Sequence, residues 1–162
     1  QRQFDVVIAT TSFHWLDTEV RYAKTAQALK EGGFLVLLWN TPPQLSCQEH
    51  QNLQAVYQLH APKLGKYERH QDYQCNIAQF PQQAIASGYF HDLTTEQAVV
   101  PVRYSIEDYL ILLSTLSPYI RLTPESRQSL FTALKSKLQQ IGDRHSQLDL
   151  SYLSMLQILR KS

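Results

Sequence analysis

A group of polar and aromatic side chains follows the first apolar segment of the chain. After Phe4–Ala9 the sequence continues Thr-Thr-Ser-Phe-His-Trp-Leu-Asp, ending at Asp17. Hydroxyl groups and backbone amides in such a turn can hold a carboxylate or an ammonium group, and Trp15 adds a large flat surface. His14 is the obvious candidate for a general base, because an imidazole with an ordinary pKa of about 6.5 can act near neutral pH.

Each of these residues also has an ordinary structural role. Trp15 is more often a packing residue under the start of a helix than a ligand contact. His14 can be a hydrogen-bonded structural histidine. Thr10 and Thr11 can satisfy backbone amides at the end of a strand, although a ligand at that strand end would have to pass them. Both kinds of role stay open for these four residues.

The elements that must position this turn are two strands and a helix. Phe4–Ala9 and Phe34–Trp39 are continuous apolar runs, which predicts strands buried on both faces. Between them, Asp17 can cap a helix that Gly32-Gly33 ends in a left-handed turn. The result is a βαβ unit with parallel strands and a right-handed crossover.

Ligands of parallel α/β sheets bind at the carboxyl ends of the strands. The site is therefore expected at Thr10–Trp15 and at Asn40–Pro43. Asn40 is the first polar residue after the second strand, whereas Trp39 is predicted to belong to the core.

Helices are predicted in the middle of the chain. Ser46 and Glu49 form a capping-box pattern that opens a helix ending before Pro62. An irregular connection is expected to about Tyr73, and a short helix at Pro81–Ser87.

Two strands and two helices are predicted in the last third of the chain. His91–Val102 is predicted to be a strand, in which Pro101 favours a sheet edge because proline lacks a backbone donor. Capping patterns at Ser105–Asp108 and Thr123–Glu125 then open two helices. The last strand is expected to alternate over Leu148, Leu150, Tyr152, Leu156 and Ile158.

Composition bounds the class of protein. The 162 residues are 43% hydrophobic and 18% charged, as in a globular domain of ordinary size. A formal net charge of +1 gives no support for nucleic acid or a membrane surface as partner. Two isolated cysteines, Cys47 and Cys75, exclude a disulfide framework and favour a cytoplasmic location. The longest apolar run is far shorter than a membrane span.

Basic residues gather loosely at Lys63, Lys66, Arg69 and His70, but Glu68 and Asp72 interrupt them. A solvated loop is the more common role of such a mixed-charge stretch, and a binding patch is the alternative.

The residues from Phe4 to Asn40 carry a resemblance to a known family. FDVVIATTSFHWLD, followed by a helix and ALKEGGFLVLLWN, resembles the fourth strand, fourth helix and fifth strand of class I S-adenosylmethionine-dependent methyltransferases. It is most similar to the type 11 group that includes trans-aconitate methyltransferase, where a strand leads to His-Trp and an acid. The segment Gly88-Tyr89-Phe90 and the two late strands fit the same family.

This resemblance implies an α/β fold class: the C-terminal portion of a Rossmann-like class I methyltransferase sheet, with parallel strands and a terminal antiparallel hairpin. In the family the seventh strand lies between the fifth and the sixth, which leaves the sixth at the edge. Residues 1–162 then form a single, incomplete methyltransferase domain, and residues 105–142 form a helical insertion between the last two strands.

The resemblance also implies S-adenosylmethionine as cofactor, a small-molecule methyl acceptor and no metal. His14 is the expected catalytic base where the acceptor must lose a proton. An acceptor that is already an ionised carboxylate would need a cationic anchor such as Arg103 or Arg121, for which simple solvent exposure is the more common state. The residues expected to contact the cofactor are Thr10, Thr11, Ser12 and Trp15, and those expected to contact the substrate are Asn40, Tyr67 and Arg103.

Two parts of the family's cofactor site have no counterpart in this sequence: the glycine-rich turn after the first strand and the acidic residue after the second. Gly32-Gly33 cannot replace that turn, because this pair follows a helix and precedes a strand. The chain is therefore expected to be a C-terminal fragment that is inactive alone. Because the neighbouring strand is absent, Phe4–Ala9 is expected at a sheet edge that pairs two copies into a homodimer.

Two alternatives remain. One is a non-catalytic α/β interaction module. The other is a dinucleotide-binding dehydrogenase, which the His14-Trp15 turn and the late hairpin disfavour.

Overall fold

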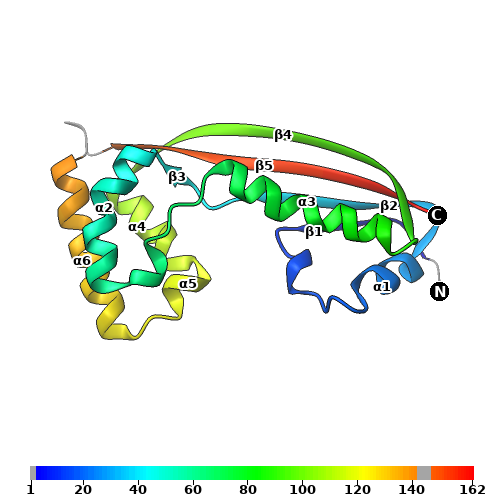
Figure 1. Ribbon diagram of the computed structural model, residues 1–162, viewed down its shortest axis with the longest axis horizontal. Coiled ribbons are helices and arrows are strands. Elements are labelled where there is room, and N and C mark those ends of the chain that lie inside the picture. The colour runs from blue at the N-terminus through cyan, green and yellow to red at the C-terminus, as the bar shows by residue number, and fades with distance from the viewer. Residues whose placement is uncertain (1–2, 142–146) are drawn as a thin grey trace. The chain divides into compact units, whose positions relative to one another are not determined.

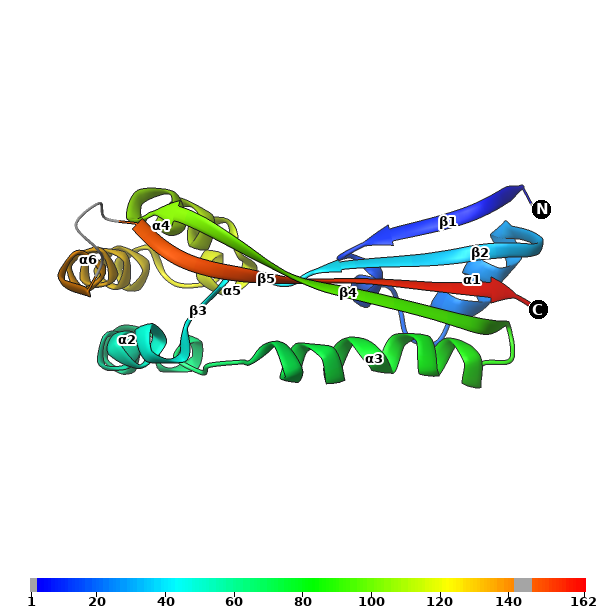
Figure 2. The same ribbon diagram turned by 90° about the horizontal axis from the view of Figure 1, so that it is seen from above.

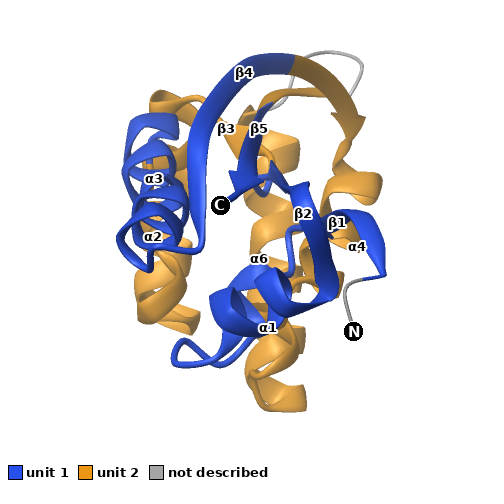
Figure 3. Cartoon of the chain, turned by 90° about the vertical axis from the view of Figure 1, so that its right-hand side faces the viewer, with its two compact units in different colours: residues 1–42, 69–100, 152–162 blue, residues 43–68, 101–151 orange. Residues whose placement is uncertain are grey.

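The computed structural model describes residues 3–141 and 147–162. Within these residues the chain forms two compact units, which Figure 3 colours separately. Unit 1 comprises Gln1–Pro42, Arg69–Val100 and Tyr152–Ser162, and unit 2 comprises Pro43–Glu68 and Pro101–Ser151. The predicted boundary of the helical insertion at Gly142 lies outside the described residues.

The sheet of unit 1 has the expected strand order. β1 (Phe4–Thr10) is parallel to β2 (Leu29–Asn40), and β5 (Gln147–Lys161) is antiparallel to β2. β4 (Phe90–Ser105) pairs with β5, so that β5 lies between β2 and β4 (Figure 2). This confirms the prediction that the last strand, β5, lies beside the second parallel strand, β2. It also confirms that the strand containing Pro101, β4, lies outside β5.

The connection between β1 and β2 differs from the prediction. Helix α1 spans Arg21–Ala28 and begins four residues after Asp17, whose carboxylate instead accepts a hydrogen bond from the Glu19 backbone N–H at 2.9 Å. The predicted glycine stop is wrong, because β2 begins directly after the helix and contains Gly32-Gly33. At these glycines the β1–β2 register shifts, and a Cβ on Gly33 would lie 3.0 Å from the Asp5 carbonyl oxygen. The glycines therefore allow a strand irregularity rather than a helix end.

Helix α3 (His70–Ala86) is much longer than predicted. The expected irregular connection to Tyr73 and short helix from Pro81 are both wrong. Pro81 lies inside the helix and is buried. Ile77 and Ala84 of α3 are also buried, so burial of this helix face holds the helix together across a residue that cannot donate its own hydrogen bond.

Helices α1 and α3 contribute to the core on one face of the unit 1 sheet (Figure 1). Side chains that alternate along β2 and β5 form the sheet side of this core. The buried residues are Phe13, Tyr22, Ala26, Leu29, Leu35, Leu37, Trp39, Ile77, Ala84, Phe90, Leu153, Met155 and Leu159.

The opposite face of this sheet is open within the described residues. In the β1–β2 register Val6 lies beside Phe34, and Ile8 lies beside Val36. Val6, Ile8 and Phe34 are exposed, whereas Val36 is half-buried. Phe4 and Leu38 are exposed as well. The prediction that the two parallel strands are buried on both faces is therefore wrong for the residues described, since only one face is covered.

Unit 2 is mainly helical. It contains β3 (Gln44–Leu45), α2 (Cys47–His60), the 3-10 helix η2 (Pro62–Leu64), α4 (Ile106–Thr115), α5 (Ser117–Ile120) and α6 (Pro124–Ile141). The predicted capping box is confirmed: the Glu49 backbone N–H donates to Ser46 Oγ at 3.2 Å, and the Ser46 backbone N–H donates to the Glu49 carboxylate at 3.1 Å. Ser105 likewise caps α4 through the Asp108 backbone N–H at 3.0 Å.

Strand β5 supplies side chains to both cores, but its alternation is not continuous. Leu148 and Leu150 belong to the core of unit 2, whereas Leu153 and Met155 belong to the core of unit 1. The buried positions thus change from even to odd numbers across the segment 151–152. The predicted single alternation is wrong beyond that segment: Leu156 and Ile158 are only half-buried. None of the described helices has the length and apolar composition that crossing a lipid bilayer requires.

Candidate functional site

The turn after β1 is held by one buried aromatic ring. Phe13 lies in the 3-10 helix η1 (Phe13–Trp15) and is 1% exposed, with its ring centroid 5.5 Å from that of Tyr22. The Trp15 backbone N–H donates to the Ser12 carbonyl at 3.0 Å. Because Phe13 points into the core, its neighbours His14 and Trp15 are displayed at the surface.

Thr11 joins the ends of the two parallel strands. Its backbone N–H donates to the Leu38 carbonyl at 2.7 Å, and its Oγ1 accepts from the Asn40 backbone N–H at 3.1 Å. Its φ of 44° is unusual for a β-branched residue. Thr11 thus has the structural role that the sequence left open, and its contact with a cofactor stays a prediction.

His14 and Trp15 form an exposed pair of rings. Their centroids are 4.7 Å apart and their planes are inclined by 40°. The packing role favoured for Trp15 from the sequence is wrong, because the side chain is 65% exposed. Trp39 is also close to His14, with centroids 5.9 Å apart. His14 therefore has one exposed and one buried indole as neighbours.

Trp39 is a core residue, as predicted, and its indole is held by a residue that sequence reasoning missed. The indole Nε1–H donates to Gln157 Oε1 at 3.0 Å, and Gln157 is 1% exposed. The ring also packs on Phe80, with centroids 4.8 Å apart. The available signal was Gln157 itself, which stands between Leu156 and Ile158 in the last strand, because such a buried amide needs a polar partner.

Asn40 lies beside the turn, as its position after β2 predicts. In addition to its backbone bond to Thr11, its Oδ1 accepts a hydrogen bond from Ser154 Oγ at 2.8 Å. Thr10 and Ser12 are exposed, and Ser12 makes no side-chain capping bond to η1. Unit 1 therefore brings together all the predicted residues from Thr10 to Trp15 with Asn40.

Arg21 is a buried charge that the sequence did not reveal, since an arginine at the start of a helix is normally solvated. Its guanidinium carbon lies 5.0 Å from the Tyr22 ring centroid and 5.1 Å from that of Phe80, and one guanidinium nitrogen donates to Gln83 Oε1 at 2.6 Å. Burial raises the pKa of Tyr22, and the neighbouring guanidinium lowers it in part. Arg21 thus joins α1 and α3 through cation–π contacts.

Tyr67 and Arg103, predicted to contact the substrate, belong to unit 2. The Tyr67 hydroxyl donates to the Leu45 carbonyl at 3.4 Å, and its ring centroid lies 5.0 Å from that of His50. Arg103 pairs with Asp149 at 2.8 Å, and both side chains are largely exposed. Arg103 is therefore exposed, as is usual for arginine, and Arg121 is exposed as well.

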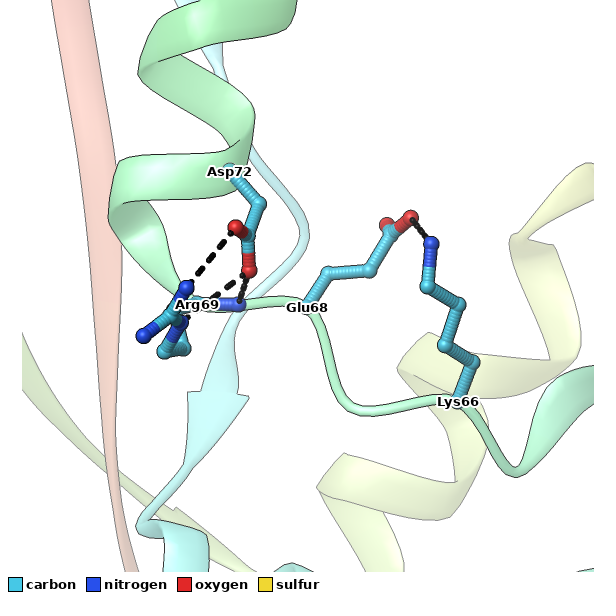
Figure 4. Close-up of polar contacts among 4 residues, drawn as sticks. All are labelled: Lys66, Glu68, Arg69 and Asp72. Carbon is cyan, nitrogen blue, oxygen red and sulfur yellow. Dashed lines mark hydrogen bonds and ion pairs between the residues drawn. The ribbon is translucent and has the colours of Figure 1, made fainter.

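The loosely basic segment is balanced by its own acidic residues (Figure 4). Lys66 pairs with Glu68 at 3.5 Å, and Arg69 pairs with Asp72 at 3.3 Å. The Arg69 backbone N–H also donates to the Asp72 carboxylate at 2.8 Å, at the start of α3. These contacts favour a solvated loop over a binding patch.

The turn fits part of a cofactor such as S-adenosylmethionine. The hydroxyls of Thr10 and Ser12 and the Trp15 ring are exposed at the carboxyl end of β1, where ligands of parallel sheets bind. The Thr11 hydroxyl is already used by Asn40. Gly32-Gly33 lies at the start of β2, away from its carboxyl end at Asn40, and forms no ligand-binding turn there.

Neither a family model nor a curated protein matches the sequence, but solved structures do. A protein described as a type II methyltransferase from Anaeromyxobacter dehalogenans matches with a TM-score of 0.57 and 16% identity, over 94% of this chain and 63% of that chain. A Bacillus halodurans C-125 protein described as a methyltransferase matches with a TM-score of 0.45 and 16% identity, over 98% and 64%.

A third structure is the Haemonchus contortus phosphoethanolamine N-methyltransferase 2 in complex with S-adenosyl-L-methionine, at a TM-score of 0.32 and 16% identity over 94% and 33%. The chain thus spans less than two thirds of the length of each of these structures. By its strand order and its likeness to the first of them, the chain has the fold of the class I S-adenosylmethionine-dependent methyltransferases.

Proposed function

We propose that the protein to which this chain belongs transfers a methyl group from S-adenosylmethionine to a small-molecule acceptor. A fold alone does not determine function, so the proposal rests on the site. The observation that carries it is the turn after β1, which is held by buried Phe13 and displays His14 and Trp15 at the carboxyl end of a parallel strand. That is where an α/β sheet of this kind binds its ligands.

When bound, S-adenosylmethionine supplies an electrophilic methyl group on a positively charged sulfur. The residues of this chain then have mainly positioning roles, because methyl transfer depends chiefly on alignment. Thr10, Ser12 and Trp15 provide exposed hydroxyls and a ring for the cofactor, and Thr11 fixes the turn. No metal is needed for these roles.

His14 has the proposed role of general base. An acceptor hydroxyl or ammonium group must lose a proton, which an imidazole nitrogen of His14 would accept. Packing of the ring against Trp39 limits its orientations. Asn40, Tyr67 and Arg103 are the proposed contacts of the acceptor, of which Asn40 belongs to the same unit as His14.

The 162-residue chain is expected to bind S-adenosylmethionine poorly when it is produced by itself. The glycine-rich turn and the ribose-binding acid of the family have no counterpart in it, so the turn from Thr10 to Trp15 would have to supply all the affinity. Isothermal titration of this chain and of the protein encoded by the complete gene measures the difference. Micromolar affinity in the chain alone would contradict the expectation.

A non-catalytic interaction module is the second candidate. It is favoured by the open face of the unit 1 sheet, where Phe4, Val6, Ile8 and Phe34 are exposed. An apolar face of this kind is often a protein contact. Measured with the complete protein, failure to bind S-adenosylmethionine would favour this module, and stoichiometric binding would favour the enzyme.

We propose a reducing, cytoplasmic setting for either function. Cys47 and Cys75 are both free and exposed, and exposed free thiols persist best where glutathione keeps them reduced.

A further inference from the structure

The side chains of His14 and Trp15, called here the aromatic corner, are exposed on a turn whose Phe13 is buried in the core. Phe13 fixes the turn through its contacts with the rings of Tyr22 and Phe80 in the core. Trp39 packs against His14. A ring that is held in place before a ligand arrives loses little conformational freedom on binding. The backbone of the turn and the His14 ring are therefore held in place by buried neighbours before a ligand arrives.

The spacing of the two rings excludes one mode of binding. A flat ring inserted between two others needs centroids about 7 Å apart, twice the separation of carbon atoms in contact. In the aromatic corner the centroids are 4.7 Å apart. A planar ligand therefore cannot enter between the rings, and a ligand has to bind on an outer ring face.

The charged residues next to the aromatic corner in the chain are compatible with a cation. The charged side chains exposed in the segment 10–20 are Asp17 and Glu19, which are both acidic. The nearest following cation, Arg21, is 6% exposed and is held between aromatic rings. The negative face of an exposed indole attracts cations, and the charged residues that follow Trp15 most closely in the chain carry no positive charge that would oppose this.

We propose that the aromatic corner binds a methylated onium group, a positively charged nitrogen or sulfur that carries methyl groups, through cation–π contact with Trp15. The proposal rests on the proposed function for the source of that group. In methyl transfer the group is either the sulfonium of the cofactor or the ammonium of an amine acceptor or its methylated product. The contact with Trp15 is the same in both cases.

The test compares two molecules of the same shape that differ in charge. Choline and 3,3-dimethylbutan-1-ol are titrated into the chain at constant ionic strength and constant pH. The indole N–H resonances are followed by nuclear magnetic resonance, with buried Trp39 as the internal reference. Choline is expected to shift the Trp15 resonance with an affinity about three-fold or more above that of the alcohol.

Variants identify the ring that binds. W15L is expected to abolish the preference for choline, measured by the choline methyl resonances, whereas W15F should retain part of it. Tyr89 is the control, because it is an exposed aromatic residue outside the aromatic corner, at 45% exposure. Y89L should leave choline binding unchanged. Equal affinities for choline and the alcohol, no response to either, or a choline preference that survives in W15L would overturn the proposal.

A second comparison distinguishes the two sources. In the complete protein, a larger Trp15 shift with S-adenosylmethionine than with neutral S-adenosylhomocysteine assigns the group to the cofactor. Equal Trp15 shifts with S-adenosylmethionine and S-adenosylhomocysteine, together with retained choline binding, assign the onium group to the acceptor. Charge-selective binding of choline in a protein that transfers no methyl group would remove the proposed function and leave the aromatic corner as a binding site.

Discussion

Gln157 is a polar side chain in the core, and its hydrogen bond to Trp39 can be measured. The change Q157L should lower the free energy of unfolding by about 1–3 kcal/mol, because it leaves the buried indole N–H without an acceptor. Urea denaturation measures this loss. W39F should cost less stability in the Q157L background than in the unmodified chain, since phenylalanine has no N–H to satisfy. Additive effects of the two changes would contradict a direct coupling.

His14 can be tested in the complete protein. If it is the general base, H14A should lower kcat clearly, by about a hundred-fold or more, while the affinity for S-adenosylmethionine changes little. An acceptor that needs no deprotonation would be the matched control, because its methylation should be spared. Unchanged turnover in a folded H14A protein would leave His14 only its packing against Trp39.

The burial of a single residue was predictable from the sequence where its neighbours in the chain determine that burial. Trp39 ends an apolar strand and is buried, and Asn40 after it lies beside the turn. Trp15 was misjudged because Phe13, two positions earlier, takes the core position of the turn. Arg21 escaped notice because its burial depends on α3, about sixty residues away. Contacts so distant leave no local pattern.

At the scale of elements, the tyrosines in the helices of unit 2 predict sensitivity to alkali. Burial raises the pKa of Tyr57, Tyr109 and Tyr119. In the unfolded chain these phenols ionise at about pH 10, whereas in the folded unit they stay neutral to higher pH. The stability that they contribute is therefore complete below about pH 10 and is lost as the pH rises toward the raised folded values.

The alkaline transition should respond to removal of one buried phenol. Y109F keeps the ring and removes the ionisable group, so it should shift unfolding to higher pH, measured by circular dichroism from about pH 8 to about pH 12. The exposed Tyr89 provides the control, because Y89F should leave the transition in place. The same midpoint in Y109F and the unmodified chain would rule out this contribution of Tyr109.

Elements were predictable where capping residues mark them. The hydrogen bonds at Ser46 and Ser105 start α2 and α4 at the predicted places. α3 was missed because Pro81 normally ends a helix and here lies buried within one. The glycine pair before Phe34 was misread as a helix end, since glycine serves helix ends and strand irregularities equally.

At the scale of the whole molecule, the edge of the sheet predicts self-association. β1 pairs only with β2 among the described strands, and Phe4, Val6 and Ile8 are exposed on it. We propose that two copies pair antiparallel through this strand, since identical chains expose identical edges. Light scattering at micromolar concentration should show a dimer or a larger species.

A charge on the edge strand should prevent this association. I8K is expected to give monomers, because an exposed lysine on an edge strand opposes pairing. L59K is the control, since Leu59 is 77% exposed on α2 in the other unit. A monomeric unmodified chain would contradict the proposal, as would an I8K chain that still associates.

The antiparallel pairing of β2 with β5 also has a consequence for folding during synthesis. Trp39 and Gln157, which hydrogen-bond across this pair of strands, are 118 residues apart in the chain. Closing so long a loop is slow compared with forming helices, whose contacts are local. The nascent chain therefore carries β2 with one edge of unpaired backbone donors and acceptors until β5 has left the ribosome, and an unpaired strand edge of this kind favours aggregation during that interval.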